Sequence, residues 1–340
     1  MSRRKKLALA ALGTIAALVL GGTVWILVAG DFAIHEERVT IEGPRGELHA
    51  VLATPVNSEG PHGLVVFVHG DGPANASRDD TYKPLWDAYA KAGFATLSWD
   101  KPGVGGAPGD WLDQSMHDRE TEVEAAVSWA YTRPDIDTTR IGVWGDGQAG
   151  WVVPEVLAAR NDLRFAVLVG PAVNWLRQHE FALRSDLSAH GAPAPEASAE
   201  LARRAQRVRL LEEGAGYAAY RRSGIDPEPM TPAQWGFAER NLRSDATASL
   251  PGIAVPLLLV LGGDDRTVDV DETESVYRRT VRPDLLTVKR FDDATHSITR
   301  EGIEYRDDFR VAARTRFAPS SVYSPGYLDA LRVFAKRHSQ

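Results

Sequence analysis

A short glycine-rich stretch carries the residues whose types and spacing suggest chemistry. The apolar run Ile141 to Trp144 precedes Gly145-Asp146-Gly147-Gln148-Ala149-Gly150, and a helical pattern follows from Trp151 to Arg160. A buried strand, a tight turn and a helix form the setting of a nucleophile elbow, whose pattern is Gly-x-Ser-x-Gly. The position expected to hold the serine is Gly147, which has no side chain. The turn therefore has the setting for covalent catalysis but lacks the nucleophile.

Other polar residues follow other apolar runs. Because ligands in open α/β sheets bind at the carboxyl ends of the strands, these residues are expected near Gly147. The chain order is elbow, then acid, then histidine, which is one of the known orders for nucleophile, acid and base. The residues are His69, Gly70, Asp100, Asp265 and His296.

The rest of the chain supplies the elements that must position these residues. Apolar runs predict strands that alternate with helices, which indicates an α/β fold with a mostly parallel, doubly wound sheet in one domain over 31–340. Residues 174–250 are charged, alanine-rich and helical, and predict a helical lid inserted into that domain. The predicted strands are 38–42, 47–54, 64–68, 94–99, 141–144, 165–169, 256–261 and 285–291. The predicted helices are 82–92, 116–131, 151–160, 270–280 and 325–338.

The N-terminus predicts a membrane anchor within residues 1–30. A basic tip, Arg3-Arg4-Lys5-Lys6, precedes 23 uncharged residues from Leu7 to Ala29. As a helix this run spans about 34 Å, enough to cross a bilayer. The basic tip should stay in the cytoplasm, which places the domain on the outer side of the cell membrane as a single-pass protein. A cleaved signal peptide, giving a secreted protein, is the main alternative, although signal peptides have shorter apolar regions. The third interpretation of this run is a buried core helix.

Composition excludes several classes of protein. The net charge is -7 over 340 residues, which argues against a nucleic-acid partner. The absence of cysteine excludes disulfides, thiolate metal sites and a cysteine nucleophile. No metal-ligand spacing is present, so no metal or cofactor is expected. A bound cation remains an alternative, although the spacing of the residues does not support it. The side chains suited to bind it are those of Asp71, Asp146, Asp265 and His296.

Taken together, four segments resemble the α/β-hydrolase superfamily, particularly its bacterial esterase-like and acyl-peptidase-like members. Those proteins often carry H-G-S-G-P, D-x-x-G-x-G, W-G-H-S-Q-G-G-W and G-x-x-D-x-x-V. The resemblance runs from about residue 38 to the end, outside the lid. The segments here are His69-Gly70-Asp71-Gly72-Pro73, Asp100-Lys101-Pro102-Gly103-Val104-Gly105, Trp144-Gly145-Asp146-Gly147-Gln148-Ala149-Gly150-Trp151 and Gly262-Gly263-Asp264-Asp265-Arg266-Thr267-Val268.

The resemblance implies a role for each matching residue. Asp265, or its neighbour Asp264, would orient His296, and His296 would act as general base. The backbone N–H groups of Asp71 and Gln148 would form the oxyanion hole. The remaining residues would hold the surrounding loops; they are His69, Gly70 and Asp100.

Three departures from the family pattern fall in the site itself. Gly147 replaces serine, Asp71 replaces a small polar residue, and Asp146 replaces the usual histidine. If both carboxylates point into the pocket, each opposes a developing oxyanion about 5 Å away by roughly 3 kcal/mol at an effective dielectric near 20. These changes fit the loss of ester hydrolysis or a new role.

Three functions remain open on the sequence. The first is a membrane-anchored pseudoenzyme that binds a small acyl compound or a peptide under the lid. The second is an active hydrolase of esters, thioesters or amides that uses a water activated by His296, or Asp146 as nucleophile. The third is a structural envelope protein whose pocket is filled by side chains.

Overall fold

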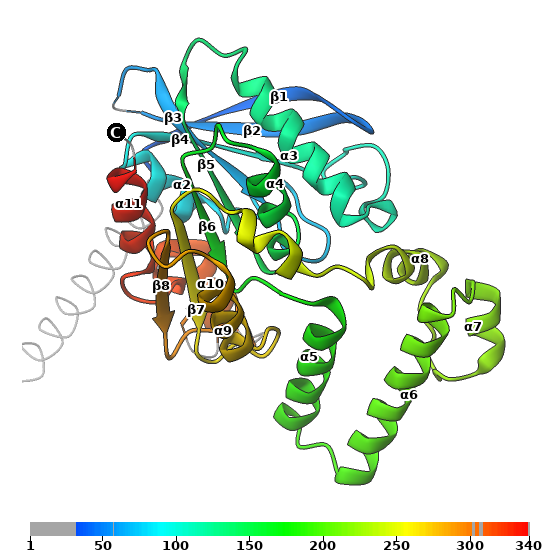
Figure 1. Cartoon of the computed structure of the whole chain (residues 1–340). Coiled ribbons are helices and arrows are strands. Elements are labelled where there is room, and N and C mark those ends of the chain that lie inside the picture. Colours follow the sequence, from blue (N-terminus) through cyan, green and yellow to red (C-terminus); the bar gives the residue numbers. More distant parts are fainter. Residues whose placement is uncertain (1–31, 57, 301–302, 306–308, 339–340) are drawn as a thin grey trace, which may run out of the picture.

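The computed structural model describes residues 32–56, 58–300, 303–305 and 309–338. Its centre is an eight-stranded sheet in the order β1-β2-β4-β3-β5-β6-β7-β8 (Figure 1). Strands β1, β2 and β4 pair antiparallel, and β4, β3, β5, β6, β7 and β8 run parallel. The predicted mostly parallel sheet is therefore confirmed. The strands are β1 Ile34–Gly43, β2 Gly46–Pro55, β3 His62–Val68, β4 Phe94–Trp99, β5 Ile136–Asp146, β6 Phe165–Val169, β7 Leu257–Gly262 and β8 Leu286–Phe291.

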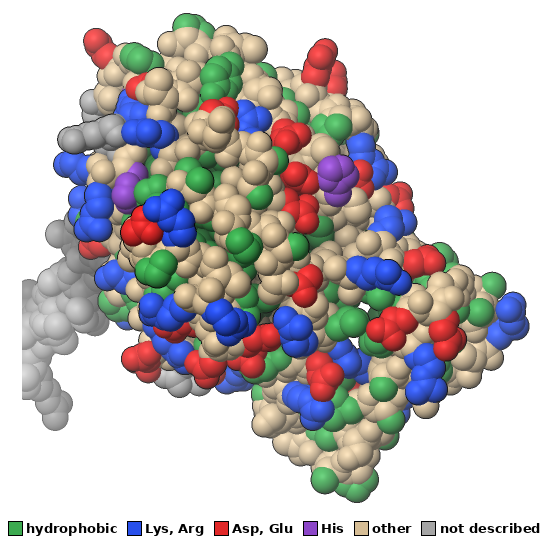
Figure 2. Space-filling model, viewed as in Figure 1, with side chains coloured by type: hydrophobic (Ala, Val, Ile, Leu, Met, Phe, Trp, Pro, Cys, Tyr) green, Lys and Arg blue, Asp and Glu red, His purple; other side chains and the backbone are tan. Residues whose placement is uncertain are grey.

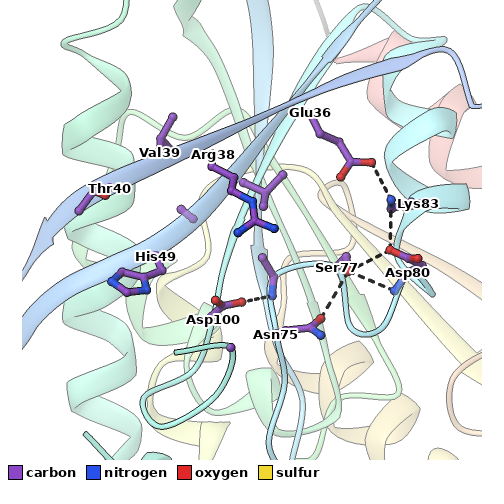
Figure 3. A pocket seen from close by; sticks show the side chains of 14 residues that line it. Glu36, Arg38, Val39, Thr40, His49, Asn75, Ser77, Asp80, Lys83 and Asp100 are labelled. Atoms are coloured by element: carbon purple, nitrogen blue, oxygen red, sulfur yellow. Dashed lines mark hydrogen bonds and ion pairs between the residues drawn. The ribbon is translucent and has the colours of Figure 1, made fainter. Parts of the chain in front are cut away.

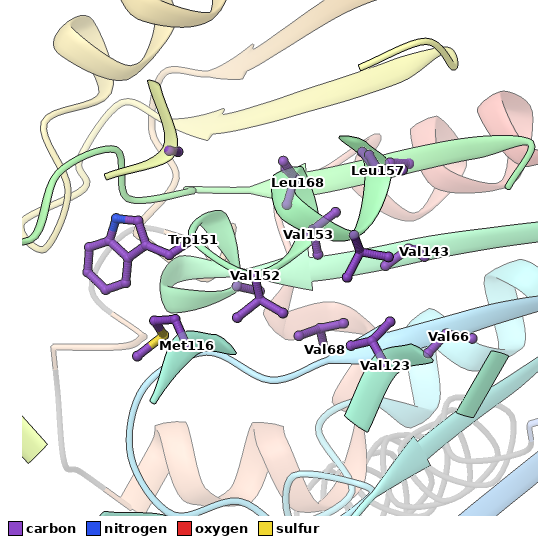
Figure 4. Close-up of a cluster of buried hydrophobic side chains, with 14 of the residues drawn as sticks. Val66, Val68, Met116, Val123, Val143, Trp151, Val152, Val153, Leu157 and Leu168 are labelled. Carbon is purple, nitrogen blue, oxygen red and sulfur yellow. The ribbon is translucent and has the colours of Figure 1, made fainter. Parts of the chain in front are cut away.

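The central strands are buried on both faces, which explains their continuous apolar runs. Every residue of β3, β4, β6 and β7 is buried. Alternate residues of one strand enter different cores: Val66 joins a cluster with Val143 and Val152 (Figure 4), whereas Phe67 joins a cluster with Trp144. Helices therefore cover both faces of the sheet, as a doubly wound fold requires. Figure 2 shows acidic and basic side chains interspersed over one face of the molecule.

Ten helices flank the sheet or follow β6 in the part of the chain that the structure describes. The flanking helices are α2 Lys83–Ala90, α3 Met116–Ala130, α4 Val153–Ala159, α9 Val270–Thr280, α10 Phe309–Phe317 and α11 Tyr327–Arg337. Helix α10 was not predicted from the sequence. The helices between β6 and β7 are α5 Trp175–Ala189, α6 Ala194–Glu212, α7 Tyr217–Ser223 and α8 Pro232–Asn241.

The insertion between β6 and β7 is helical, as expected for residues 174–250. Helices α5 and α6 project from the sheet in Figure 1, and each buries a single residue, Trp175 and Leu211 respectively. Helix α8 is attached more firmly, because the Asn241 side chain accepts the N–H of Met116 and donates to the carbonyl of Gln114. A lid function for this insertion stays a prediction.

The predicted membrane anchor, residues 1–30, lies outside the described residues. Within the described ranges, no helix has both the length and the apolar character needed to cross a bilayer.

Candidate active site

The turn that ends β5 places Gly147 at its apex. Gly147 has a φ of +49°, in the left-handed region that glycine adopts readily, and it begins a 3-10 turn that leads into α4. Its carbonyl accepts the N–H of Ala172 at 3.0 Å, which fixes the turn against the segment after β6. A β-carbon added at Gly145 would lie only 2.6 Å from Cβ of Ala149, so this close approach also requires glycine. The predicted strand, turn and helix are present.

An aspartate–histidine pair faces this apex. Nδ1 of His296 lies 2.7 Å from Oδ2 of Asp265, whose other oxygen accepts the backbone N–H groups of Thr267 and Val268. Asp264 instead lies beside Arg266, so Asp265 is the partner of the histidine. A β-carbon built on Gly147 would lie 2.9 Å from Nε2 of His296. The free ring nitrogen is therefore directed at the position of the missing side chain.

The surroundings of His296 favour its charged form. Burial alone lowers the pKa of His296, but the charge and the hydrogen bond of Asp265 outweigh burial, and Glu304 and Asp146 add to them, which raises this pKa to about 9. At pH 7 both ring nitrogens therefore carry protons and donate. In this state His296 donates a hydrogen bond toward the apex and accepts no proton from water.

We predict that an NMR titration of His296 has its midpoint near pH 9 and that Asp265→Asn moves the midpoint down toward or below 6.5. Because the folded pKa lies above the unfolded value, the stability from this pair is fully present below about pH 6.5 and is lost as the pH rises through 9. Asp264→Asn is the matched control and should leave the midpoint unchanged. A wild-type midpoint at or below 6.5 would contradict the assignment.

Residues 69–72, termed the oxyanion loop, are held by buried side chains. Nζ of Lys101 donates to the carbonyls of Gly70 at 2.6 Å and Gly72 at 2.7 Å. His69 donates from Nε2 to the Trp99 carbonyl at 2.7 Å, which matches the loop-holding role expected for it. Because C=O and N–H point in opposite directions across a trans peptide, the Asp71 N–H points away from Lys101. Its role as an oxyanion donor stays a prediction.

A buried arginine links the oxyanion loop to the elbow. Arg119 donates to the His69 carbonyl and, at 2.8 Å, to Oε1 of Gln148. Nε2 of Gln148 in turn donates to Oδ1 of Asp71 at 2.9 Å. Neither Arg119 nor Lys101 was assigned a role from the sequence. The sequence could have pointed to Lys101, because this residue lies within one of the family motifs. It could not have pointed to Arg119, because this residue lies in a helical pattern with no feature of a functional site.

The carboxylate of Asp146 is paired with Arg78 and Tyr82 and does not line the cavity above the apex. Oδ2 accepts from Arg78 at 2.9 Å and Oδ1 accepts from the Tyr82 hydroxyl at 3.3 Å. The carboxylate lines a separate cavity of about 160 Å³ together with Trp144 and Tyr323. Its charge is partly offset by Arg78, although it still helps to raise the pKa of His296. Of the two carboxylates, only Asp71 lines the cavity above the apex. This placement weakens the expected repulsion by Asp146 and argues against its use as nucleophile.

Asp100 braces a neighbouring loop. Its Oδ1 accepts the N–H of Ala76 at 2.7 Å (Figure 3). It borders an open groove of about 730 Å³ whose other walls include Arg38 and His49 from β1 and β2. This groove and the cavity above Gly147 share no lining residue. Asp100 thus has the bracing contact expected of it and lies outside the reacting centre.

The cavity above Gly147 is small. Its volume is about 60 Å³, with Asp71 and His296 in its walls and Gln178 and His179 contributed by α5. Such a volume holds one or two water molecules or the end of a ligand. Helix α5 of the insertion therefore borders the candidate site directly.

The residues considered for a cation do not gather around one point. Asp146 is paired with Arg78 and Asp265 with His296. Among the described residues, one group of three has ligand atoms within 4.8 Å of one another, and its members are His117, Glu120 and Glu155 on α3 and α4. The alternative of a cation held by Asp71, Asp146, Asp265 and His296 therefore gains no support from the geometry.

Comparison with known proteins agrees with this geometry. Residues 59–302, more than two thirds of the chain, match the family described as serine aminopeptidase, S33. The chain belongs to this family of α/β-hydrolases, which confirms the superfamily inferred from the four motifs.

Solved structures show the same fold at low sequence identity. An esterase from Pyrococcus furiosus has a TM-score of 0.57 and 16% identity, with 90% of this chain and 92% of that chain covered. A 2,6-dihydroxy-pseudo-oxynicotine hydrolase has a TM-score of 0.55 and 14% identity, with 92% of this chain and 69% of that chain covered. Est1E from Butyrivibrio proteoclasticus has a TM-score of 0.53 and 14% identity, with 88% of this chain and 98% of that chain covered.

A curated Escherichia coli protein of 31.7 kDa from the traX–finO intergenic region is 29% identical over 108 residues. The match covers 32% of this chain and only 36% of that protein.

Proposed function

We propose that this chain binds a small acyl or peptide ligand at the elbow and does not form an acyl-enzyme. One observation carries the proposal: Nε2 of His296 faces a glycine, with no hydroxyl between the histidine and the apex. Covalent acyl transfer requires a nucleophile activated by such a base. The histidine remains as a hydrogen-bond donor to the oxygen of a bound ligand.

The size and charge of the cavity limit the ligand. Ligand pockets usually measure roughly 300–1,000 Å³, so a cavity of about 60 Å³ would hold only the carbonyl end of a ligand. The rest would extend past Gln178 and His179 of α5. The positive charge of His296 is balanced by its partner Asp265, so the carboxylate of Asp71 disfavours a free acid, which supports a neutral ester or amide as the ligand.

Binding without turnover can be measured by NMR. Methyl butyrate and N-methylbutanamide should cause saturable shifts of the His296 ring signals at pH 7, and methyl butyrate should remain intact. Val268 is buried in the cavity wall, so Val268→Phe should abolish the shifts. The control Val333→Phe makes the same change at an exposed position and should keep them. Absence of any shift in the folded wild type would favour a structural role, which the small cavity also fits.

A second candidate is hydrolysis by a water that His296 activates, and the intact Asp265–His296 contact favours it. Because a general base acts in its neutral form, such a rate should rise with pH up to about 9. We expect His296→Ala to abolish any rate of this kind. Initial rates of methyl butyrate hydrolysis between pH 6 and 10, corrected for buffer, check this. A rate that is equal in wild type and His296→Ala would exclude this candidate.

We also propose that Leu7 to Ala29 anchors the chain in the cell membrane, with the domain on the outer side. The length of the uncharged run and the basic residues before it support this proposal. Retention of the full chain in the membrane pellet after alkaline carbonate extraction tests it. Recovery of a shortened, secreted chain would indicate a cleaved signal peptide instead.

A further inference from the structure

Helix α10 presents an apolar stripe to solvent. Phe309 is 86% exposed and Phe317 is 47% exposed, and Ala312 between them is also exposed. Positions 309, 312, 313, 316 and 317 fall on one face, because residues three and four apart in a helix lie above one another. A stripe with this spacing ordinarily faces the core of a globular protein. In α10 it faces outward and therefore lacks a partner within the described residues.

The stripe adjoins the point where the described chain begins. Phe32 and Ile34 border the same groove, of about 680 Å³, as Ala312 and Arg316 of α10. Val56, which is 57% exposed, donates its N–H to the Ala33 carbonyl beside this point. Among the described residues, five large hydrophobic side chains are exposed, and Val56, Phe309 and Phe317 are three of them. Val56 and the groove-lining residues of α10 thus lie beside the start of β1, and Phe309 and Phe317 belong to the same nine-residue helix.

The length of the connecting chain sets how far this surface can lie from a bilayer. Only Gly30 and Asp31 separate the apolar run ending at Ala29 from Phe32. Since an extended residue spans at most about 3.6 Å, this connection bridges on the order of 10 Å. The headgroup layer on each side of the hydrocarbon is of similar thickness, roughly 5–8 Å. If the run spans the membrane, the surface around Phe32 must lie at the headgroups.

We propose that the juxtamembrane patch, which comprises Phe32, Val56, Phe309, Arg316 and Phe317, docks on the lipid surface. This inference rests on the proposed anchor. The phenyl rings enter the boundary between headgroups and acyl chains, where exposed apolar faces are stabilised. The side chain of Arg316 has no hydrogen bond or ion pair within the described part of the chain, and its guanidinium is suited to lipid phosphates. Docking holds the domain in one orientation, so the candidate site faces a fixed direction.

Single-cysteine labelling tests the docking directly, because the chain has no cysteine of its own. The full-length chain carries either Ala312→Cys on the stripe or Ala202→Cys at an exposed position of α6, each labelled with nitrobenzoxadiazole. Both variants are reconstituted in phosphatidylethanolamine–phosphatidylglycerol vesicles with nitroxide at carbon 5 of the acyl chain. We expect several-fold stronger quenching at position 312 than at 202. Adding Phe309→Ser and Phe317→Ser should remove most of the difference.

The other outcomes separate this inference from the anchor. Equal, weak quenching at both positions in chains that resist carbonate extraction would overturn the docking and leave the anchor standing. Chains released by carbonate would overturn both. A third outcome is a label at position 312 that is shielded from water but not quenched by the nitroxide, with shielding that increases with the density of protein in the vesicles. This result would show that the stripe contacts a second copy of the chain, and it would overturn the docking on lipid.

Discussion

Replacing Gly147 by serine is expected to raise the hydrolysis of p-nitrophenyl butyrate at pH 9, where neutral His296 is available as base, at least on the order of 10³-fold over the wild type. Removing the serine of a complete triad lowers kcat by about 10⁶, and partial alignment should restore part of that factor. The Asp265–His296 contact is in place, and Arg119 and Lys101 hold the oxyanion loop. The new hydroxyl would supply the one missing group.

Two local strains limit this gain. The new Cβ would lie 2.9 Å from Nε2 of His296, so the ring must withdraw by a few tenths of an ångström. A non-glycine residue in the left-handed region also costs about 1–3 kcal/mol, as at other functional turns. Gly147→Ala is the matched control, since it adds the same β-carbon without a hydroxyl, and it should stay inactive. A folded Gly147→Ser variant no faster than Gly147→Ala would show that the remaining groups are not aligned for catalysis.

Replacing Arg119 by methionine is expected to lower the free energy of unfolding by about 3 kcal/mol. The guanidinium is buried, and its loss leaves the His69 carbonyl and the Gln148 side chain without their donor. A buried polar group left without its partner costs about 1–3 kcal/mol, and more when the lost partner was charged. Chemical denaturation measures this change.

Two further variants make the test of Arg119 specific. Arg209→Met makes the same replacement at an exposed position of α6 and should change stability by less than about 0.5 kcal/mol. Combined with Gly147→Ser, Arg119→Met should lower kcat more than it changes KM, because the oxyanion loop is displaced. Equal stabilities for Arg119→Met and Arg209→Met would refute the structural role of Arg119.

Most of the sheet could be predicted because its strands are buried on both faces and therefore read as apolar runs. Strand β5 extends further than expected, to Ile136–Asp146, because polar residues such as Thr138 and Thr139 precede its buried part. Helix α10 was missed because arginines interrupt its apolar positions and its apolar stripe faces solvent. A prediction that recognises helices by an apolar face packed on the core therefore does not identify such a helix.

The site was predictable where chain order and strand ends determine it. The position of Asp265 and His296 after their strands placed them at the same edge of the sheet, and they are in contact. The direction of Asp146 was not predictable, because it depends on Arg78 and Tyr82, 68 and 64 residues earlier in the chain. Arg119 gave no signal, because an arginine within a helical pattern usually lies on the surface.

A stopped-flow experiment with p-nitrophenyl acetate at pH 9, where about half of the His296 rings are neutral and can accept a proton, tests the central claim most directly, because an acyl-enzyme releases its first equivalent of p-nitrophenol in a burst. The wild type should show no burst, while Gly147→Ser should release close to one equivalent per chain. A wild-type burst near one equivalent that disappears in His296→Ala would contradict the account.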